Sequence, residues 1–303
     1  MIKSITVTTH LGDSIKLELD KPELSGFVVK SIDGLGPGKA TINTTEVSTN
    51  DGGLFNSARM SNRNITINIA YFFNEKETIE ELRLKSYKYF PVKKKITLLF
   101  ETDSRNAEIE GYVESNEPNI FSRQEETSIS IICPDPFFYS QFPHTTIFSG
   151  IEPLFEFPFS NESLRDDLIE MGIVEYKTEE LVVYRGDADI GLTITIHAVG
   201  SASGISIHNI QTREIMRLDS SKLEELTGTD IVNGDDIIIS TIKGKKAVTL
   251  IRNGQSVNIL NCLTRDSEWF QLTKGDNIFA YTAEAGAANL QFKIENKVAY
   301  EGV

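Results

Sequence analysis

Three pairs of aspartates are the residues of this sequence whose type and spacing could support catalysis. They are Asp166 with Asp167, Asp187 with Asp189, and Asp235 with Asp236. Two carboxyl groups that act as acid and nucleophile, or as acid and base, hydrolyse glycosidic bonds, so these pairs would serve a glycosidase. Successive residues of a strand point to opposite faces, which makes Asp235 and Asp236 poor partners. An acidic chain also contains such pairs by chance, so the pairs are weak evidence for catalysis. We therefore predict that the protein has no catalytic residue and is not an enzyme.

Metal and cofactor chemistry find little support in the sequence. The four histidines are widely separated, and Cys133 and Cys262 have no second cysteine or histidine at metal-ligand spacing. Strand alternation places His197 and His208 on polar, solvent-facing sides. The chain contains no P-loop, nucleophile elbow, zinc-protease motif or dinucleotide fingerprint. We therefore predict no metal site, no cofactor and two buried free thiols.

Aromatic side chains offer a binding alternative. Trp269 is the single tryptophan, and residues 133–160 hold five of the nine prolines and seven of the 17 phenylalanines. Aromatic faces can stack on sugars, and they can equally pack at a domain junction. Proline favours an extended, stiff chain, so we place the junction here, with domains at residues 1–143 and 144–303.

Length and charge narrow the function classes. At 303 residues the chain is long enough for two domains. Its net charge of -14 has the wrong sign for holding nucleic acid by phosphate contacts. Residues 1–143 carry 16 basic and 20 acidic side chains, net -4, and residues 144–303 carry 14 and 24, net -10. No apolar run reaches the roughly 18 residues of a membrane helix, so we expect no membrane insertion.

Period-two alternation and frequent turn residues predict a mainly β protein. Alternation at residues 65–70, 96–100 and 128–132 indicates strands of the first domain, and a helix is expected at residues 74–90, capped by Asn74 with Glu77 and stopped by Pro91. In the second domain, strands are expected at residues 181–184, 192–199, 205–210, 237–242, 247–251 and 257–260, with two more near the C-terminus. Their spacing is typical of a β-sandwich. A short helix should run from Asp219 to Gly228, and Asn253-Gly254 should form a tight hairpin turn.

Residues 34–62 do not fit a compact sheet. The stretch is rich in Gly, Thr, Asn and Ser, which suits a surface loop. However, Ala40, Ile42 and Thr44 alternate with polar residues, as in a long projecting hairpin. An arm that contacts a neighbouring subunit is the second interpretation.

Several segments carry a resemblance to a known family. They are Ile32-Asp33-Gly34-Leu35-Gly36-Pro37, Asp51-Gly52-Gly53-Leu54-Phe55-Asn56-Ser57 with Arg59 and Arg63-Asn64-Ile65, Ile132-Cys133-Pro134-Asp135-Pro136-Phe137-Phe138, Gly186-Asp187-Ala188-Asp189-Ile190-Gly191, Ile207-His208-Asn209, Asn233-Gly234-Asp235 and Trp269-Phe270-Gln271-Leu272-Thr273-Lys274-Gly275-Asp276-Asn277. In this order they are similar to the distal tail protein family of long-tailed, siphovirus-type bacteriophages.

The resemblance implies a fold and a structural role. It implies an N-terminal β-sandwich-like domain with one helix and a projecting arm, followed by a galectin-like or jelly-roll β-sandwich. It also implies a homo-hexameric ring at the distal end of the virion tail, assembled in the cytoplasm of the host bacterium. The ring would join the tail-tube protein to the tail-tip hub, a tail-associated lysin or fibre protein, and DNA would pass through its channel as cargo.

The resemblance also points to interface residues and to an alternative function. The motif residues expected at the interface between subunits are Gly34, Leu35, Gly36, Pro37, Leu54, Phe55, Arg59 and Arg63. The second domain could carry a receptor-binding protein. The alternative is that this domain itself binds carbohydrate, as a host-receptor module of the tail tip.

Overall fold

The computed structural model describes residues 1–46, 51–72, 77–122, 124–152 and 173–303, which form two units. The first unit contains Met1–Phe142 and Ala299–Val303, and the second contains Pro143–Val298. The sequence predicts that residues 144–303 form one domain. The last five residues instead belong to the first unit, because strand β23 (Ala299–Tyr300) pairs with β10 (Phe138–Ser140).

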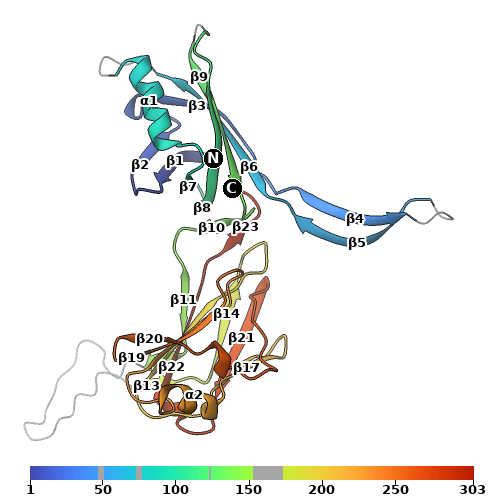
Figure 1. The fold of residues 1–303 in the computed structure, drawn as a ribbon, viewed down its shortest axis with the longest axis vertical. Coiled ribbons are helices and arrows are strands. Elements are labelled where there is room, and N and C mark those ends of the chain that lie inside the picture. Colours follow the sequence, from blue (N-terminus) through green and yellow to red (C-terminus); the bar gives the residue numbers. More distant parts are fainter. Residues whose placement is uncertain (47–50, 73–76, 123, 153–172) are drawn as a thin grey trace, which may run out of the picture. The chain divides into compact units, whose positions relative to one another are not determined.

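The first unit is built on one antiparallel sheet of nine strands (Figure 1). Seven of them lie in the order β2 (Ser14–Glu18), β1 (Ile2–Thr9), β7 (Lys95–Thr102), β8 (Asn106–Pro118), β9 (Glu126–Cys133), β6 (Arg63–Tyr71) and β3 (Phe27–Asp33). β10 pairs with β8 and β23, and a short 3-10 helix, η1 (Pro22–Leu24), precedes β3. The three strands predicted in this domain lie within β6, β7 and β9, which confirms them.

Alternation along the strands forms the core of this unit. On β6, Ile65, Ile67 and Ile69 are fully buried, while the residues between them are less so. Each such side chain contributes roughly 1.5–3 kcal/mol by leaving water. The same cluster takes inward residues from every long strand of the sheet and from the helix. Burial of one face of each strand fixes the pairing register, since a shift by one residue would expose the core face.

The predicted helix is shorter than expected at its start. α1 spans Ile79–Tyr89, and Thr78 forms a capping box with Glu81. Asn74 lies outside the described residues, so the predicted cap is replaced by a Thr-x-x-Glu pattern four residues later. The helix ends at Tyr89 with Phe90 as its C-cap, directly before Pro91, where the sequence predicts the stop. Leu82 is buried against the sheet, and a Cβ on Gly26 would lie 2.3 Å from its Cδ2 atom, so Gly26 is required for this close approach.

Residues 34–62 contain a hairpin. β4 (Ala40–Glu46) and β5 (Gly53–Met60) pair only with each other and extend away from the ends of β3 and β6 (Figure 1). Every residue of β4 is exposed, as are all residues of β5 except Met60. The described part of the stretch is therefore the projecting hairpin and not an irregular loop. We call β4 and β5 the arm.

The second unit contains two packed antiparallel sheets. The larger has the order β11 (His144–Ile147), β22 (Leu290–Asn296), β15 (Thr193–Ala198), β18 (Asp236–Ser240), β19 (Ala247–Arg252) and β20 (Gln255–Asn258). The smaller has the order β14 (Glu179–Tyr184), β21 (Gly275–Thr282), β16 (Ser206–Asn209) and β17 (Glu214–Arg217). β12 (Ser149–Glu152) pairs with β13 (Ile173–Tyr176). The described part of the unit also contains two short 3-10 helices, η2 (Leu260–Cys262) and η3 (Ala287–Asn289).

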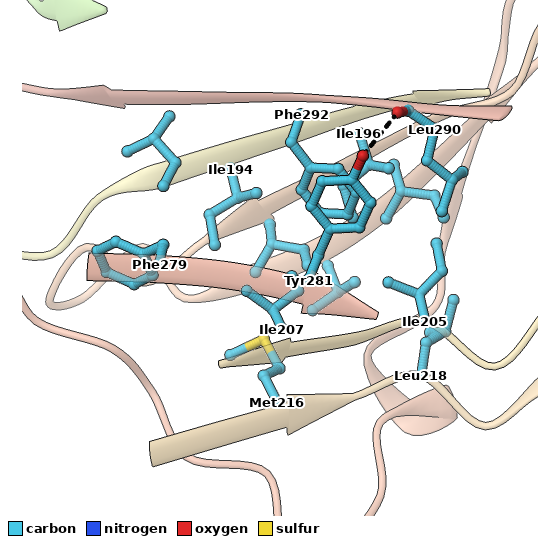
Figure 2. Close-up of a cluster of buried hydrophobic side chains, with 14 of the residues drawn as sticks. Ile194, Ile196, Ile205, Ile207, Met216, Leu218, Phe279, Tyr281, Leu290 and Phe292 are labelled. Carbon is cyan, nitrogen blue, oxygen red and sulfur yellow. Dashed lines mark hydrogen bonds between the residues drawn. The ribbon is translucent and has the colours of Figure 1, made fainter. Parts of the chain in front are cut away.

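The core of the second unit lies between these sheets (Figure 2). Ile194 and Phe292 from the larger sheet meet Ile207 and Tyr281 from the smaller one. The rings of Tyr281 and Phe292 stack with centroids 3.8 Å apart, and the Tyr281 hydroxyl donates to the carbonyl of Leu290 at 3.2 Å. These sheets confirm the predicted β-sandwich, whereas a specific likeness to galectins stays a prediction.

Local predictions in the second unit are confirmed with two corrections. α2 spans Ser220–Thr227 between the Asp219 cap and Gly228, whose φ of 84° is left-handed. The sequence predicts that both Leu223 and Leu226 of this helix face the core, but only Leu223 is buried and Leu226 is exposed. The strand expected at residues 257–260 ends at Asn258 because η2 follows it. The Asn253-Gly254 turn has positive φ at both residues, as a type I′ hairpin requires.

Two further observations bear on the sequence predictions. Among the described residues, none of the helices is both long enough and apolar enough to cross a membrane.

Both cysteines are free and buried, as predicted. Burial raises the pKa of Cys262, and it raises the pKa of Cys133 to about 12.

The buried thiols give a first prediction. Native protein at pH 8 should incorporate no iodoacetamide, whereas protein unfolded in urea should incorporate it at both cysteines, as mass spectrometry can count. Burial keeps the Cys133 thiol protonated in the folded state. Above about pH 8.5 the same thiol therefore ionises in the unfolded chain before it ionises in the folded one. The free energy of unfolding should therefore fall as the pH rises toward 12. Two labels on each native chain at pH 8 would contradict the buried positions.

Candidate assembly interface

Cross-strand pairing divides the arm into two faces. Ala40 pairs with Met60, Ile42 with Ala58 and Thr44 with Phe55, and cross-strand partners share a face. These residues form the face that we call the apolar face of the arm. The alternate pairs place the polar residues Thr41, Asn43, Thr45, Ser57 and Arg59, with Leu54, on the opposite face.

A β-bulge determines which face receives Phe55. The register passes from Asn43 opposite Ser57 to Thr44 opposite Phe55, so Asn56 is the extra residue. Without this bulge, simple alternation would place Phe55 beside Ser57 on the polar face. The bulge instead brings Phe55 to the same face as Ile42, and its neighbour Leu54 consequently lies on the opposite face.

The polar face satisfies its own hydrogen bonds. Asn43 Nδ2 donates to Ser57 Oγ at 3.0 Å, and Asn56 Nδ2 donates to Thr45 Oγ1 at 2.6 Å. The hydroxyls of Thr41 and Ser61 share a hydrogen bond of 2.7 Å. Short-range polar contacts of this kind hold the two strands in register without a further partner.

The apolar face leaves large side chains in solvent. Ile42 is 62% exposed and Phe55 is 67% exposed. A two-stranded ribbon is only marginally stable by itself in water, and its outer edges offer unpaired backbone groups. Contiguous exposed apolar residues on such a ribbon are typical of a contact with another chain.

The base of the arm is held by a buried arginine. Arg63 begins β6, is 4% exposed, and places its guanidinium 4.6 Å from the ring centroid of Phe138. Its Nη1 donates to the carbonyls of Gly34 at 2.6 Å and Gly36 at 2.5 Å. Nε donates to the carbonyl of Pro136 at 2.6 Å, and Nη2 donates to that of Glu301 at 2.7 Å. Burial lowers the pKa of Arg63 from its usual value.

Gly34 makes this arrangement possible. Its φ is 89°, and a Cβ at this position would lie 2.1 Å from the carbonyl oxygen of Asn64. The chain therefore leaves β3 through a conformation that is open to glycine and strained for other residues. Gly36, two positions later, has no atom within 4 Å of its notional Cβ.

The predicted interface residues fall into two groups in the structure. Gly34, Leu35, Gly36, Pro37 and Arg63 lie at the base of the arm, and the Arg63 side chain is buried there instead of facing a partner. Leu54, Phe55 and Arg59 lie on β5 and are exposed. Their role at an interface stays a prediction.

Sequence reasoning missed other residues of this region. Ile42, Ala58 and Met60 complete the apolar face, and the alternation of Ala40, Ile42 and Thr44 was the signal that could have identified it. The bulge at Asn56 and the contact between Arg63 and Glu301 have no local signature in the sequence.

The aspartates considered for catalysis have other environments. Asp235 is buried and accepts from Arg252 Nε at 2.8 Å and Nη2 at 2.6 Å, while the Asp236 carboxylate accepts from His197 Nδ1 at 2.7 Å. Their opposite orientation matches the prediction. Asp166 and Asp167 lie outside the described residues. Within the described ranges, no cluster of three or more potential metal ligands occurs.

Trp269 and His208 also have structural surroundings. Trp269 packs partly buried against the core of the second unit, and the ammonium of Lys246 lies 5.1 Å from its ring centroid. His208 is half-buried, and burial lowers its pKa. Sugar binding by Trp269 stays a prediction.

Comparison with known proteins defines the class of this mainly β, two-unit chain. Residues 185–296 match the model of the siphovirus-type tail component, C-terminal domain. The crystal structure of the SPP1 Dit (gp 19.1) protein, described as a paradigm of the hub adsorption apparatus in phages that infect Gram-positive bacteria, superposes with a TM-score of 0.64 at 14% identity, covering 97% of this chain and 98% of that chain.

Residues 185–296 are therefore similar to the C-terminal domain of siphovirus-type tail components, and the whole chain shares the fold of the Dit protein. This confirms the predicted resemblance. The phage P2 baseplate in its activated conformation with Ca also aligns, at 11% identity over 98% of this chain and 99% of that chain, with a TM-score of 0.49. No curated protein matches the sequence.

The base of the arm gives a second prediction. Gly34→Ala should lower the free energy of unfolding by about 1–3 kcal/mol or more, because it combines a positive φ with a backbone clash. Gly36→Ala is the matched control and should change it by less than about 1 kcal/mol, since the site is open. Urea denaturation of both variants measures the difference. Equal stability of the two variants would contradict the close approach at Gly34.

Proposed function

We propose that this protein is a structural adaptor at the distal end of a siphovirus-type phage tail. Six copies form a ring that joins the tail-tube protein to the tail-tip hub and leaves a channel for DNA. The family match of residues 185–296 and the fold shared with the Dit protein, whose structure is described as a hub paradigm, support this assignment. The role requires no reaction, and we infer that the protein is not an enzyme.

The single observation that carries the ring is the two-faced arm. Its polar face is internally hydrogen-bonded, whereas Ile42 and Phe55 on the other face are exposed. An identical arm on every copy, docked on the next copy, makes a head-to-tail contact. Such contacts close into a ring when the rotation between copies divides a full turn.

The second unit has a different role in this proposal. We assign ring formation to the first unit and the binding of a further tail protein, such as a receptor-binding protein, to the second. The second half of the chain also carries most of the net charge, -10 against -4. We place most of this acidity at the periphery of the ring, and a smaller contribution from carboxylates of the first unit at the channel, where negative charge would repel DNA phosphates.

Ring assembly gives a third prediction. Phe55→Ser should raise the protein concentration needed for ring formation by about tenfold or more, because one large apolar contact is lost. Leu54→Ser is the matched control: Leu54 is 63% exposed against 67% for Phe55, and it lies next in sequence on the opposite face. Light scattering across a concentration series, with negative-stain images, measures both variants beside the unmodified protein.

The outcomes separate the interpretations. A hexamer or double hexamer that is weakened by Phe55→Ser and not by Leu54→Ser supports docking through the apolar face. Equal effects of the two substitutions would refute the assignment of the face. A strict monomer at every concentration would contradict self-assembly through the arm, and glycan binding by the second unit would then be the next measurement.

A further inference from the structure

The last described residues return to the first unit and pair at the base of the arm. In β23, Ala299 pairs with Tyr139 and Tyr300 pairs with Phe138. The Arg105 guanidinium lies 4.6 Å from the ring centroid of Tyr300. This segment, Ala299–Val303, therefore docks on the sheet of the first unit although it follows the entire second unit in the chain.

The same segment contacts the loop from which the arm departs. The Val303 amide donates to the carbonyl of Leu35 at 3.1 Å, and the Glu301 carbonyl accepts from Arg63 Nη2 at 2.7 Å. A Cβ on Gly302 would lie 3.0 Å from the Leu35 carbonyl oxygen, so the two backbones approach closely. Arg63 and Val303 thus both hold the loop, through the carbonyls of Gly34, Leu35 and Gly36.

Arg63 makes these contacts interdependent. Its four hydrogen bonds all go to backbone carbonyls, two in the loop of Gly34 and Gly36, one at Pro136 and one at Glu301. A buried charged group that loses an acceptor incurs the full cost of its desolvation. Loss of the Glu301 carbonyl should therefore weaken the hold of Arg63 on Gly34 and Gly36, at the point where the arm begins.

We propose that Ala299–Val303 is a lock for the arm. When this segment docks, Arg63 and Val303 fix the loop at residues 34–36 and so fix the direction in which the arm presents its apolar face. When it is absent, the arm is attached to the sheet through a loosened base. Because the segment follows the second unit in the chain, the arm becomes competent for assembly only after the second unit has been made. The assembly part of this inference rests on the proposed ring.

The test compares the full chain with three variants. A chain ending at Val298 lacks the segment. Val303→Pro removes the amide donor to Leu35 together with the valine side chain that packs against the core of the first unit, and Val303→Ala is its matched control, which loses that side chain but keeps the amide. Amide hydrogen exchange is measured under monomeric conditions at residues 34–40 and 61–63, with β7 and β19 as internal references for global folding. Ring formation of the same proteins is then followed by light scattering.

The expected result is a local change. The chain ending at Val298 and Val303→Pro should exchange about tenfold faster at residues 34–40, with unchanged β7 and β19, while Val303→Ala should behave like the full chain. Both weakened variants should also need about tenfold more protein to form rings. If the shortened chain exchanges faster in β7 as well, the Val303→Pro and Val303→Ala pair decides the outcome.

Two results would overturn the lock. The first is unchanged exchange at residues 34–40 in Val303→Pro. The second is ring formation at the concentration of the full chain despite a loosened base, which would disprove the coupling to assembly. Faster exchange in a protein whose full chain forms no ring would instead support the lock and disprove the proposed ring, so the two proposals fail separately.

Discussion

A buried positive charge must find hydrogen-bond acceptors, and in this protein the acceptors of Arg63 come from three distant parts of the chain. Gly34 and Gly36, Pro136 and Glu301 supply carbonyl oxygens to one guanidinium that is 4% exposed. The four hydrogen bonds of Arg63 therefore form only when the loop at residues 34–36, the segment before β10 and the segment after β23 lie next to one another. The position of the arm depends on this meeting.

The two faces of the arm differ because cross-strand partners in a two-stranded ribbon share a face. Polar side chains on one face bond to each other and hold the register, so the other face is available for a partner. The bulge at Asn56 decides that Phe55 joins Ile42 on that face. A projecting ribbon with one apolar face suits assembly better than binding of a small molecule, because it encloses no cavity.

The second unit is stabilised by a core between two sheets, unlike the exposed arm. Its two sheets bury one continuous apolar cluster, and the main buried charge, Asp235, is matched in a bidentate pair by Arg252. Removing either partner of this pair would leave an uncompensated buried charge, so the pair serves the structure of the unit. Of the groups that suggested sugar chemistry, Asp187 pairs with Lys274 at 3.3 Å, Asp235 pairs with Arg252, and Trp269 packs against the core of the unit.

The strand faces, the type I′ turn at Asn253-Gly254 and the cap of α2 could be predicted from the amino-acid sequence, because these features depend on neighbouring residues. The alternation at residues 40–44 indicated a ribbon, but it left a loop and an arm as alternatives. The bulge at Asn56, the burial of Arg63 and the place of Ala299–Val303 in the first unit became known from the three-dimensional structure. Each of these depends on contacts between residues far apart in the chain, and local pattern and spacing carry no signal for them.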